Sequence, residues 1–262
     1  MQIMGILNVT PDSFSDGGKF KVLDDAQNQF DRLLAQGSDL VDIGAESSRP
    51  GASPIDEVQE WLRLEPILDR LEKRQLLHLV SVDTYKPSIM KQACAMGVRF
   101  VNNIGGLTDH PTLCFLAKHG VSYVAMHKQG NPQEMQARPL NGDQCLPELR
   151  KFFVSANGEL ARAGFSSSQI WLDPGIGFGK TDAANLLALR EVANANGSGN
   201  FLIGVSRKSC IGRILGIDHP IDRDPASKMI ELGMMLSGVG MIRTHDVAPV
   251  ALMRRMLDGE IL

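Results

Sequence analysis

Short apolar segments and longer amphipathic segments alternate along the chain. The short segments are rich in Val, Ile and Leu, and such continuous apolar runs are typical of strands buried on both faces of a parallel sheet. They cover residues 3–7, 40–43, 79–82, 100–101, 123–126, 170–172, 201–205 and 241–242, of which 100–101 is the least marked. The segments between and after them have the apolar spacing of helices, at residues 24–36, 55–73, 87–96, 111–119, 146–163, 182–194, 225–238 and 247–257.

Strands that alternate with helices in this way indicate an α/β fold. Eight such units in 262 residues match the size of a (β/α)8 TIM barrel. No Ser/Gly-rich linker and no run of like charges divides the chain, so we expect one barrel domain over residues 1–262. An open, doubly wound sheet is the alternative architecture for the same order of elements.

Composition and charge argue against nucleic acid and membranes as binding partners. The net charge of −3 and the pI near 6.1 provide no basic surface for nucleic acid or for anionic membranes. The apolar stretches are shorter than the roughly 18 residues that span a bilayer, and the first residues lack a basic leader, so we expect a cytoplasmic protein. The four cysteines form no CxxC pair and are expected to be reduced packing residues.

Polar side chains mark the carboxyl end of nearly every expected strand. They are Asn8, Asp42, Asp83, Asn102, Asn103, His127, Asp173, the segment 206–208 and the segment 243–245. Any one of them is as well explained as a turn or cap residue. In a barrel, however, all of these ends form one rim, which is where this fold places its catalytic residues. Carboxylates, amides, Lys and Arg on such a rim can hold a planar polar heterocycle that has a charged appendage.

Three glycine-rich segments enlarge this rim. Residues 12–18 and 44–51 are long for loops between a strand and a helix, which usually have about 2–6 residues, and they are candidate lids. Residues 173–181 superficially resemble a phosphate-binding P-loop, but Pro174 stands where that pattern requires glycine. The sequence pattern alone therefore predicts a barrel with an anion-binding, mixed polar rim.

Longer blocks of sequence point to a known family. They include Met4-Gly-Ile-Leu-Asn8, Glu46-Ser-Ser-Arg49-Pro-Gly51, Asp173-Pro-Gly-Ile-Gly-Phe-Gly179, Ser206-Arg-Lys208 and Arg243-Thr-His245. With these blocks the chain resembles dihydropteroate synthase from its first expected strand to its last. The resemblance implies a Mg²⁺-dependent transferase of folate synthesis. Such an enzyme joins 4-aminobenzoate to 6-hydroxymethyl-7,8-dihydropterin diphosphate and releases diphosphate. It also implies a homodimer with small-molecule substrates.

The resemblance also assigns residues to each ligand. Pterin binding falls to Asp83, Asn102, Met126, Asp173, Gly177, Phe178, Lys208 and Arg243. Diphosphate binding falls to Asn8, Arg49, Arg243 and His245, with Asn8 also a ligand of Mg²⁺. Aminobenzoate binding falls to Phe14, Ser48, Arg49, Pro50 and Ser206. The two oxygens of the Asp173 carboxylate suit the parallel N–H donors of a pterin edge, and Lys208 suits the carbonyl side.

Some positions depart from the family pattern. Asn103 stands where Asp is usual, which predicts a missing charge near the pterin, and Lys228 interrupts a usually apolar helix. Three alternatives to the synthase stay open. Asn103 and the altered second loop, with Ala45 and Ser48, suggest a pterin-binding paralogue with weak or no activity. The carboxylate and Asn pattern is shared by pterin-binding methyltransferase barrels, and a lyase could use Lys208 as a Schiff-base amine.

Overall fold

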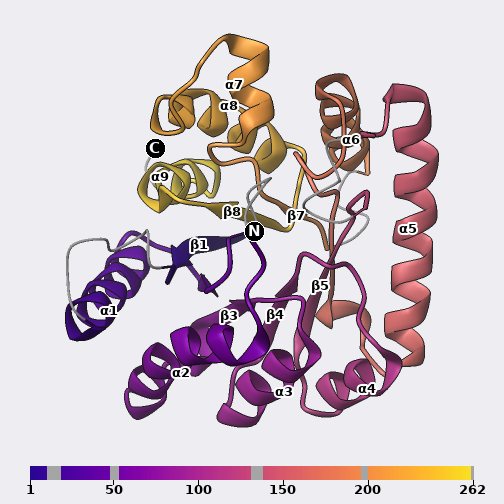
Figure 1. Ribbon diagram of the computed structural model, residues 1–262. Coiled ribbons are helices and arrows are strands. Elements are labelled where there is room, and N and C mark those ends of the chain that lie inside the picture. The colour runs from indigo at the N-terminus through magenta and orange to yellow at the C-terminus, as the bar shows by residue number, and fades with distance from the viewer. Residues whose placement is uncertain (11–18, 48–52, 131–137, 196–199, 261–262) are drawn as a thin grey trace.

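A single parallel sheet forms the centre of the molecule. The computed structural model describes residues 1–10, 19–47, 53–130, 138–195 and 200–260. The strands are β1 (Gln2–Asn8), β2 (Leu40–Gly44), β3 (Val80–Asp83), β4 (Phe100–Asn103), β5 (Ser122–Met126), β6 (Ile170–Asp173), β7 (Leu202–Ile203) and β8 (Met241–Thr244). They pair in the order β6-β5-β4-β3-β2-β1-β8-β7, and a parallel bridge between Leu172 and Phe201 connects the two outer strands (Figure 1). The expected barrel is confirmed and the open doubly wound sheet is excluded.

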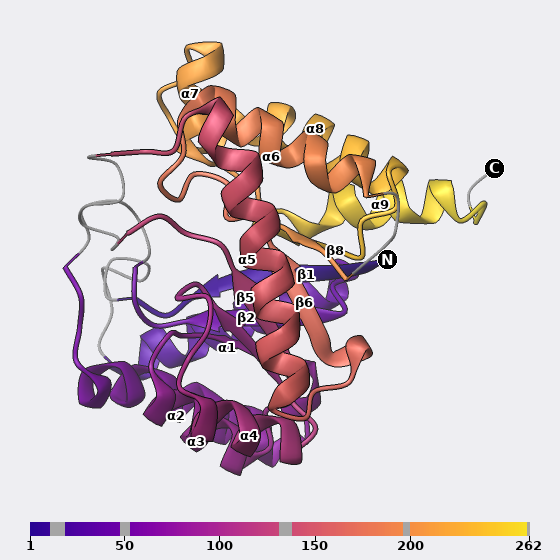
Figure 2. The ribbon, with the colours of Figure 1, turned by 90° about the vertical axis from the view of Figure 1, so that its right-hand side faces the viewer.

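Helices cover the outside of this sheet (Figure 2). They are α1 (Lys19–Ala35), α2 (Glu57–Lys73), α3 (Pro87–Met96), α4 (His110–Lys118), α5 (Gly142–Arg162), α6 (Asp182–Asn194), α7 (Ser209–Leu215), α8 (Asp224–Leu236) and α9 (Val247–Leu257). Short 3-10 turns are η2 (Leu77–Leu79), η3 (Ser167–Gln169) and η4 (Ile221–Arg223). In the described part of the chain, no helix combines the length and the apolar character needed to cross a membrane.

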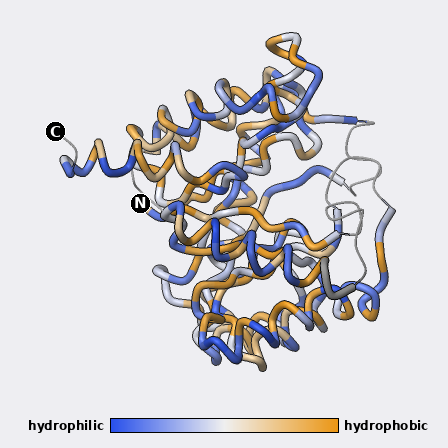
Figure 3. Tube along the Cα trace, turned by 90° about the vertical axis from the view of Figure 1, so that its left-hand side faces the viewer, coloured by the Kyte–Doolittle hydropathy of each residue, from blue (hydrophilic) through white to orange (hydrophobic). Residues whose placement is uncertain are grey.

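Two apolar layers hold the barrel together. Hydrophobic and hydrophilic positions alternate along the helices (Figure 3), and their apolar sides pack on the outside of the strands, as Leu33, Leu64 and Leu68 do. A second cluster fills the barrel at the amino ends of its strands, and it consists of Met4, Leu40, Phe100, Val124, Trp171, Leu202 and Met241. This apolar plug closes one end of the barrel, so the polar side chains at the other end define a mouth.

The register of the strands decides which polar side chains enter the mouth. Asp42 pairs with Ser81, and Asp83 pairs with Asn102. Because successive side chains of a strand face opposite ways, Asn102 enters the barrel while Asn103 faces the surrounding helices. The rim residues Asp83, Asn102 and Asp173 were expected just after their strands, but they belong to the last residues of the strands themselves.

Candidate active site

One half of the mouth is a closed network centred on Asp42. This carboxylate is fully buried and accepts hydrogen bonds from Ser81 Oγ (2.6 Å), Asn102 Nδ2 (2.9 Å) and Arg243 Nε (2.6 Å). The guanidinium of Arg243 donates a further bond from Nη2 to Asp83 Oδ2 (2.9 Å). The structure therefore brings together three residues predicted to bind the pterin: Asp83, Asn102 and Arg243. Asp42 was expected on the rim but without a role, and it proves to be their common acceptor.

The charges of this network shift the pKa values of its members. Burial and the nearby charge of Asp42 raise the pKa of Asp83 to about 7, although Arg243 opposes this change. Burial acts to lower the pKa of Arg243, but the charges of Asp42 and Asp83 outweigh it and raise the pKa. The guanidinium thus stays protonated and is shared by two carboxylates. Its plane is held by bonds at both Nε and Nη2.

The opposite half of the mouth collects an acceptor, a cation and an apolar wall. Asp173 lies at the end of β6, where its Oδ1 accepts the Gly175 N–H (2.7 Å). Phe178 packs against Met126, and Lys208 Nζ lies 4.3 Å from the centre of the Phe178 ring. The predicted pterin residues Met126, Asp173, Phe178 and Lys208 therefore lie at the same end of the barrel.

In this half of the mouth, Lys208 has no salt-bridge partner among the described residues. Burial lowers the pKa of Lys208 to about 8, and Asp173 only partly opposes that effect. Burial raises the pKa of Asp173, against the Gly175 hydrogen bond and the charge of Lys208. Salt bridges within 4.0 Å occur at many places in the described ranges, but none of them involves Lys208. A ligand with N–H donors and a carbonyl would therefore supply the partners that these groups lack.

The loop after β6 is held by a lysine for which the sequence predicted no role. Lys180 is 1% exposed, and its Nζ donates to the carbonyls of Gly175 (3.0 Å), Phe178 (3.3 Å) and His127 (3.4 Å). Burial lowers its pKa to about 8. The apparent P-loop lysine thus ties down its own loop. The position of Lys180 within the incomplete P-loop pattern was the only feature of the sequence that singled it out.

Two glycines let this loop approach the mouth closely. Gly175 has φ +65, and a Cβ there would lie 1.8 Å from the His127 carbonyl oxygen. Gly177 has φ +84, and a Cβ there would lie 3.5 Å from Lys208 Cδ. The structure therefore places the predicted Gly177 beside Lys208, with its backbone N–H bonded to Asn185 Oδ1 (2.7 Å).

A third group joins the loops after β7 and β8. Ser206 Oγ lies 2.9 Å from His245 Nδ1 and accepts the His245 backbone N–H (3.2 Å). Burial and the charges of Arg243 and Arg207 lower the pKa of His245 to about 3, so its ring is neutral and has one N–H donor. The resemblance assigns Ser206 to aminobenzoate and His245 to diphosphate, and the two side chains are in direct contact.

Five predicted site residues remain, of which the structure describes only Asn8. Asn8 ends β1 beside Gly44, and a Cβ on Gly44 would lie 3.7 Å from Asn8 Oδ1 and 3.6 Å from Asp83 Oδ2. Asn8 therefore lies at the mouth, close to the half that contains the hydrogen-bond network of Asp42, here named the paired half. Phe14, Ser48, Arg49 and Pro50 lie outside the described residues.

Asn103, where the family pattern has Asp, lies on the outer face of β4 and not inside the mouth. Its side chain faces out of the barrel, where Nδ2 donates to the Tyr123 hydroxyl and Oδ1 accepts the Gly105 N–H (2.7 Å). The Tyr123 hydroxyl in turn donates to the Gly106 carbonyl (3.1 Å). A charge at this position would therefore lie on the outer side of the sheet, behind the mouth and not inside it.

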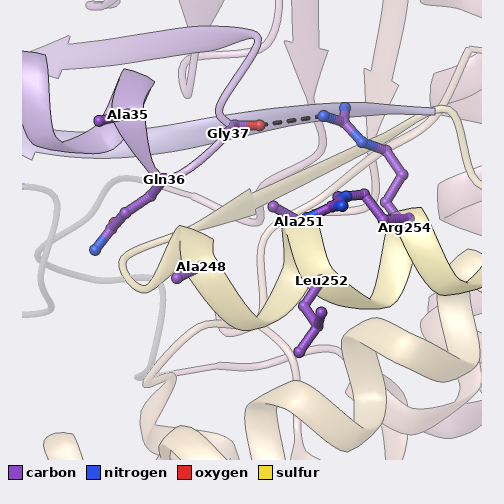
Figure 4. Close-up of a pocket in the computed structure, with 8 residues that line it drawn as sticks. Ala35, Gln36, Gly37, Ala248, Ala251, Leu252 and Arg254 are labelled. Carbon is purple, nitrogen blue, oxygen red and sulfur yellow. Dashed lines mark hydrogen bonds between the residues drawn. The ribbon is translucent and has the colours of Figure 1, made fainter. Parts of the chain in front are cut away.

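A hollow elsewhere on the molecule does not have the features of a reactive site. It has a volume of about 420 Å³ and lies between the end of α1 and helix α9, where Arg254 donates to the Gly37 carbonyl (Figure 4). Its lining is Ala35, Gln36, Gly37, Ala248, Ala251, Leu252, Arg254 and Arg255. This lining has no carboxylate or nucleophile beside the arginines, and the hollow lies at the amino end of β2, away from the mouth.

Comparison with known proteins gives one consistent family. The model of the pterin binding enzyme family matches residues 4–245. Dihydropteroate synthase of Synechocystis sp. is 40% identical over 261 residues, which are 98% of this chain and 89% of the relative. A crystal structure of the Clostridium difficile enzyme in the presence of pteroic acid has a TM-score of 0.89 at 34% identity, covering 100% of this chain and 97% of that one. The Xanthomonas albilineans enzyme with 4-aminobenzoic acid has a TM-score of 0.88 at 34% identity, covering 100% and 93%.

Proposed function

The chain belongs to the dihydropteroate synthase family, and on this premise we propose how its residues bind the two substrates and carry out the reaction. The reaction condenses 6-hydroxymethyl-7,8-dihydropterin diphosphate with 4-aminobenzoate, gives 7,8-dihydropteroate and releases diphosphate. The observation that supports this assignment most strongly is the convergence of Asp83, Asn102, Asp173, Lys208 and Arg243 at one end of the barrel.

The direct test supplies both substrates and Mg²⁺ to the purified protein and measures dihydropteroate. Product formation is expected. Tight pterin binding without product would favour the paralogue that binds but does not couple. The motives for that alternative were Asn103, whose side chain faces away from the mouth, and the altered second loop, of which Ser48 lies outside the described residues.

The pterin is proposed to lie between the two halves of the mouth. Asp173 accepts the N–H donors of the 2-amino edge, since a carboxylate that already accepts one backbone bond keeps further lone pairs. Lys208 donates to the carbonyl side, and Met126 and Phe178 contact one face of the ring. The guanidinium of Arg243, whose plane is fixed by Asp42 and Asp83, stacks on the ring.

The diphosphate is proposed to lie beside the loops after β1 and β8. Asn8, His245 and Arg243, together with Arg49, supply hydrogen bonds and charge to its oxygens. Stabilisation of the leaving group lets the bond between the pterin methylene carbon and oxygen break first, because the electron-rich pterin spreads the positive charge. The amine of aminobenzoate then attacks that carbon and loses one N–H proton, which the released diphosphate or solvent can take, so no protein nucleophile is needed. This order predicts C–O cleavage without aminobenzoate, and a strict requirement for the amine would contradict it.

We propose Mg²⁺ as the cofactor, with Asn8 as its ligand from the chain. Asn8 Oδ1 is the kind of hard oxygen donor that Mg²⁺ takes, and Mg²⁺ typically combines few protein ligands with waters and substrate phosphates. The described residues contain no cluster of three His, Cys, Asp or Glu side chains that could hold a metal instead. When bound, Mg²⁺ neutralises the departing diphosphate. In an Asn8→Ala variant, diphosphate binding should lose most of its dependence on Mg²⁺, whereas pterin binding should remain.

The two other enzyme classes are less compatible with the site. A methyltransferase has no evident use for the cluster of Ser206, Lys208, Arg243 and His245. A lyase would need Lys208 as a nucleophilic amine, and borohydride with a carbonyl substrate should then trap an adduct. We expect no adduct.

We further propose that the protein forms a homodimer through helices α8 and α9. Both helices expose large apolar side chains, namely Met229 (78%), Leu236 (66%), Leu252 (50%) and Met256 (49%). Exposed apolar side chains on two helices that pack side by side favour association with a second copy. Light scattering should give twice the chain mass, and Met229→Glu should shift the equilibrium toward the monomer.

A further inference from the structure

Helix α8 presents a lysine to the loop that contains His245. Lys228 Nζ donates to Thr244 Oγ1 (2.7 Å) and to the Asp246 carbonyl (2.7 Å), so it bonds to the residue on each side of His245. Its third bond goes to Glu231 Oε2 (2.9 Å), one helical turn further along. The lysine thus ties α8 to the backbone and the side chain that flank a predicted diphosphate ligand.

The same helix also holds the loop after β7. The backbone N–H of Arg207 donates to Ser227 Oγ (3.1 Å), and the Arg207 guanidinium makes two 2.8 Å bonds to Asp224. Arg207 has φ +59, a left-handed conformation that is strained for a side chain of this size and needs such support. Its neighbours in the chain are Ser206 and Lys208.

The two loops that α8 holds are joined to each other at the site. Ser206 in the first loop contacts His245 in the second through Nδ1 and through the backbone N–H. The position of His245 therefore depends on contacts from two directions: Ser206 on the side of the mouth, and Lys228 on the side of the helix layer.

The buried ion pair of Lys228 and Glu231 is poorly explained by a contribution to folding stability alone. Glu231 is fully buried, and in the described part of the chain its Oε1 has no hydrogen-bond partner. Burial raises the pKa of this carboxyl, against the charge of Lys228. Well-packed apolar residues would often serve the fold as well as a buried pair of this kind, whereas only a donor can bond to Thr244 and Asp246 together.

From these contacts we propose that Lys228 is a positioning residue, which fixes the loop 244–246 and so places His245 for the diphosphate of the substrate. The proposal rests on the proposed function, because that function assigns diphosphate to His245. The expected consequence is specific to one ligand: loss of Lys228 should weaken diphosphate binding and leave the pterin ring and aminobenzoate sites intact.

The test compares two variants. Lys228→Met alone would leave Glu231 buried without its partner, so the informative variant is the double Lys228→Met/Glu231→Met, which removes both charges and keeps the volume. The matched control is Glu231→Gln, which keeps the lysine and an oxygen acceptor for it. Calorimetry with inorganic diphosphate and Mg²⁺ measures the anion site, calorimetry with 6-hydroxymethyl-7,8-dihydropterin measures the ring site, and thermal unfolding checks the fold.

We expect the double variant to bind diphosphate about tenfold more weakly, with pterin affinity and Tm close to those of the native chain. The KM for pterin diphosphate should rise by a similar factor, while the KM for aminobenzoate stays constant. Glu231→Gln should bind diphosphate within about twofold of the native chain. A folded double variant with native diphosphate affinity would overturn the positioning role alone. A native chain that binds no diphosphate at all would overturn the proposed function as well.

Discussion

The two halves of the barrel mouth treat their charges differently. Around Asp42, every charged group already has a partner, since Arg243 bonds to both Asp42 and Asp83. Around Lys208, the acceptor Asp173 and the cation face the mouth without a salt bridge between them in the described residues. The charged groups of the first half, the paired half, therefore have partners within the protein, although the buried Asn102 Oδ1 has no hydrogen-bond partner among the described residues. In the second half, the open half, Lys208 forms no salt bridge with a described residue.

This contrast separates stability from binding. Groups that satisfy one another inside the protein contribute to the folded state itself, and removal of one leaves a buried charge. Charged groups that are buried without a partner destabilise the folded state, because they lose contact with water; the lowered pKa of Lys208 indicates this effect. Substitutions in the paired half should therefore affect the free energy of unfolding, and substitutions in the open half should affect ligand affinity.

Removal of the shared acceptor is the strongest test of the paired half. Asp42→Ala leaves the Arg243 Nε without its partner and also frees the donors of Ser81 and Asn102. We expect the free energy of unfolding to fall by about 3–5 kcal/mol. Denaturant titration measures this change. A loss below about 1 kcal/mol, the range of an exposed pair, would show that the network is not structurally coupled.

In the open half, the corresponding change should act on the ligand. Asp173→Asn removes the charge and one acceptor at the pterin edge, and Lys208→Met removes the donor on the other side. Each should weaken pterin binding by about 1.5–3 kcal/mol, the range for hydrogen bonds to a charged group. Tm should stay near the native value or rise, because neither residue forms a salt bridge in the described structure and Asn keeps an oxygen acceptor for the Gly175 N–H. Native pterin affinity in either variant would contradict the assignment of that edge.

The pH dependence of stability tests the charge on Asp83. In the folded chain its pKa is about 7, against an ordinary 3.8, so between these values the folded state holds a proton that the unfolded chain has lost. Raising the pH through this window therefore favours unfolding, and the effect is complete above about pH 7. The stability of the native chain relative to Asp83→Asn should fall by on the order of 2 kcal/mol from pH 4 to pH 8. Parallel stability curves for the two proteins would rule out the raised pKa.

The sequence predicted the strands better than the contacts between them. All eight apolar runs contain strands, because continuous burial is a local signal, but β7 covers only Leu202–Ile203 of the expected residues 201–205. Helix α7 escaped notice because its seven residues begin directly after Lys208 and end before Gly216. The role of Asp42 could not be predicted, since its partners Ser81, Asn102 and Arg243 are 39, 60 and 201 residues away in the chain. Only the barrel register brings them together.

Asn103 offers the smallest expected effect and the sharpest check of that register. Sequence reasoning ended the strand at residue 101, so it could not assign Asn102 to the inside and Asn103 to the outside. In the structure Asn103 bonds to Tyr123 and Gly105, on the far side of the sheet from the paired half. Asn103→Asp keeps an acceptor for the Gly105 N–H, and the Tyr123 hydroxyl can donate to it. Pterin affinity should therefore change by less than about 0.5 kcal/mol, as for a substitution that does not contact the ligand. Calorimetry with the dihydropterin measures this, and a change of fivefold or more would mean that the outer face of β4 does act on the pterin site.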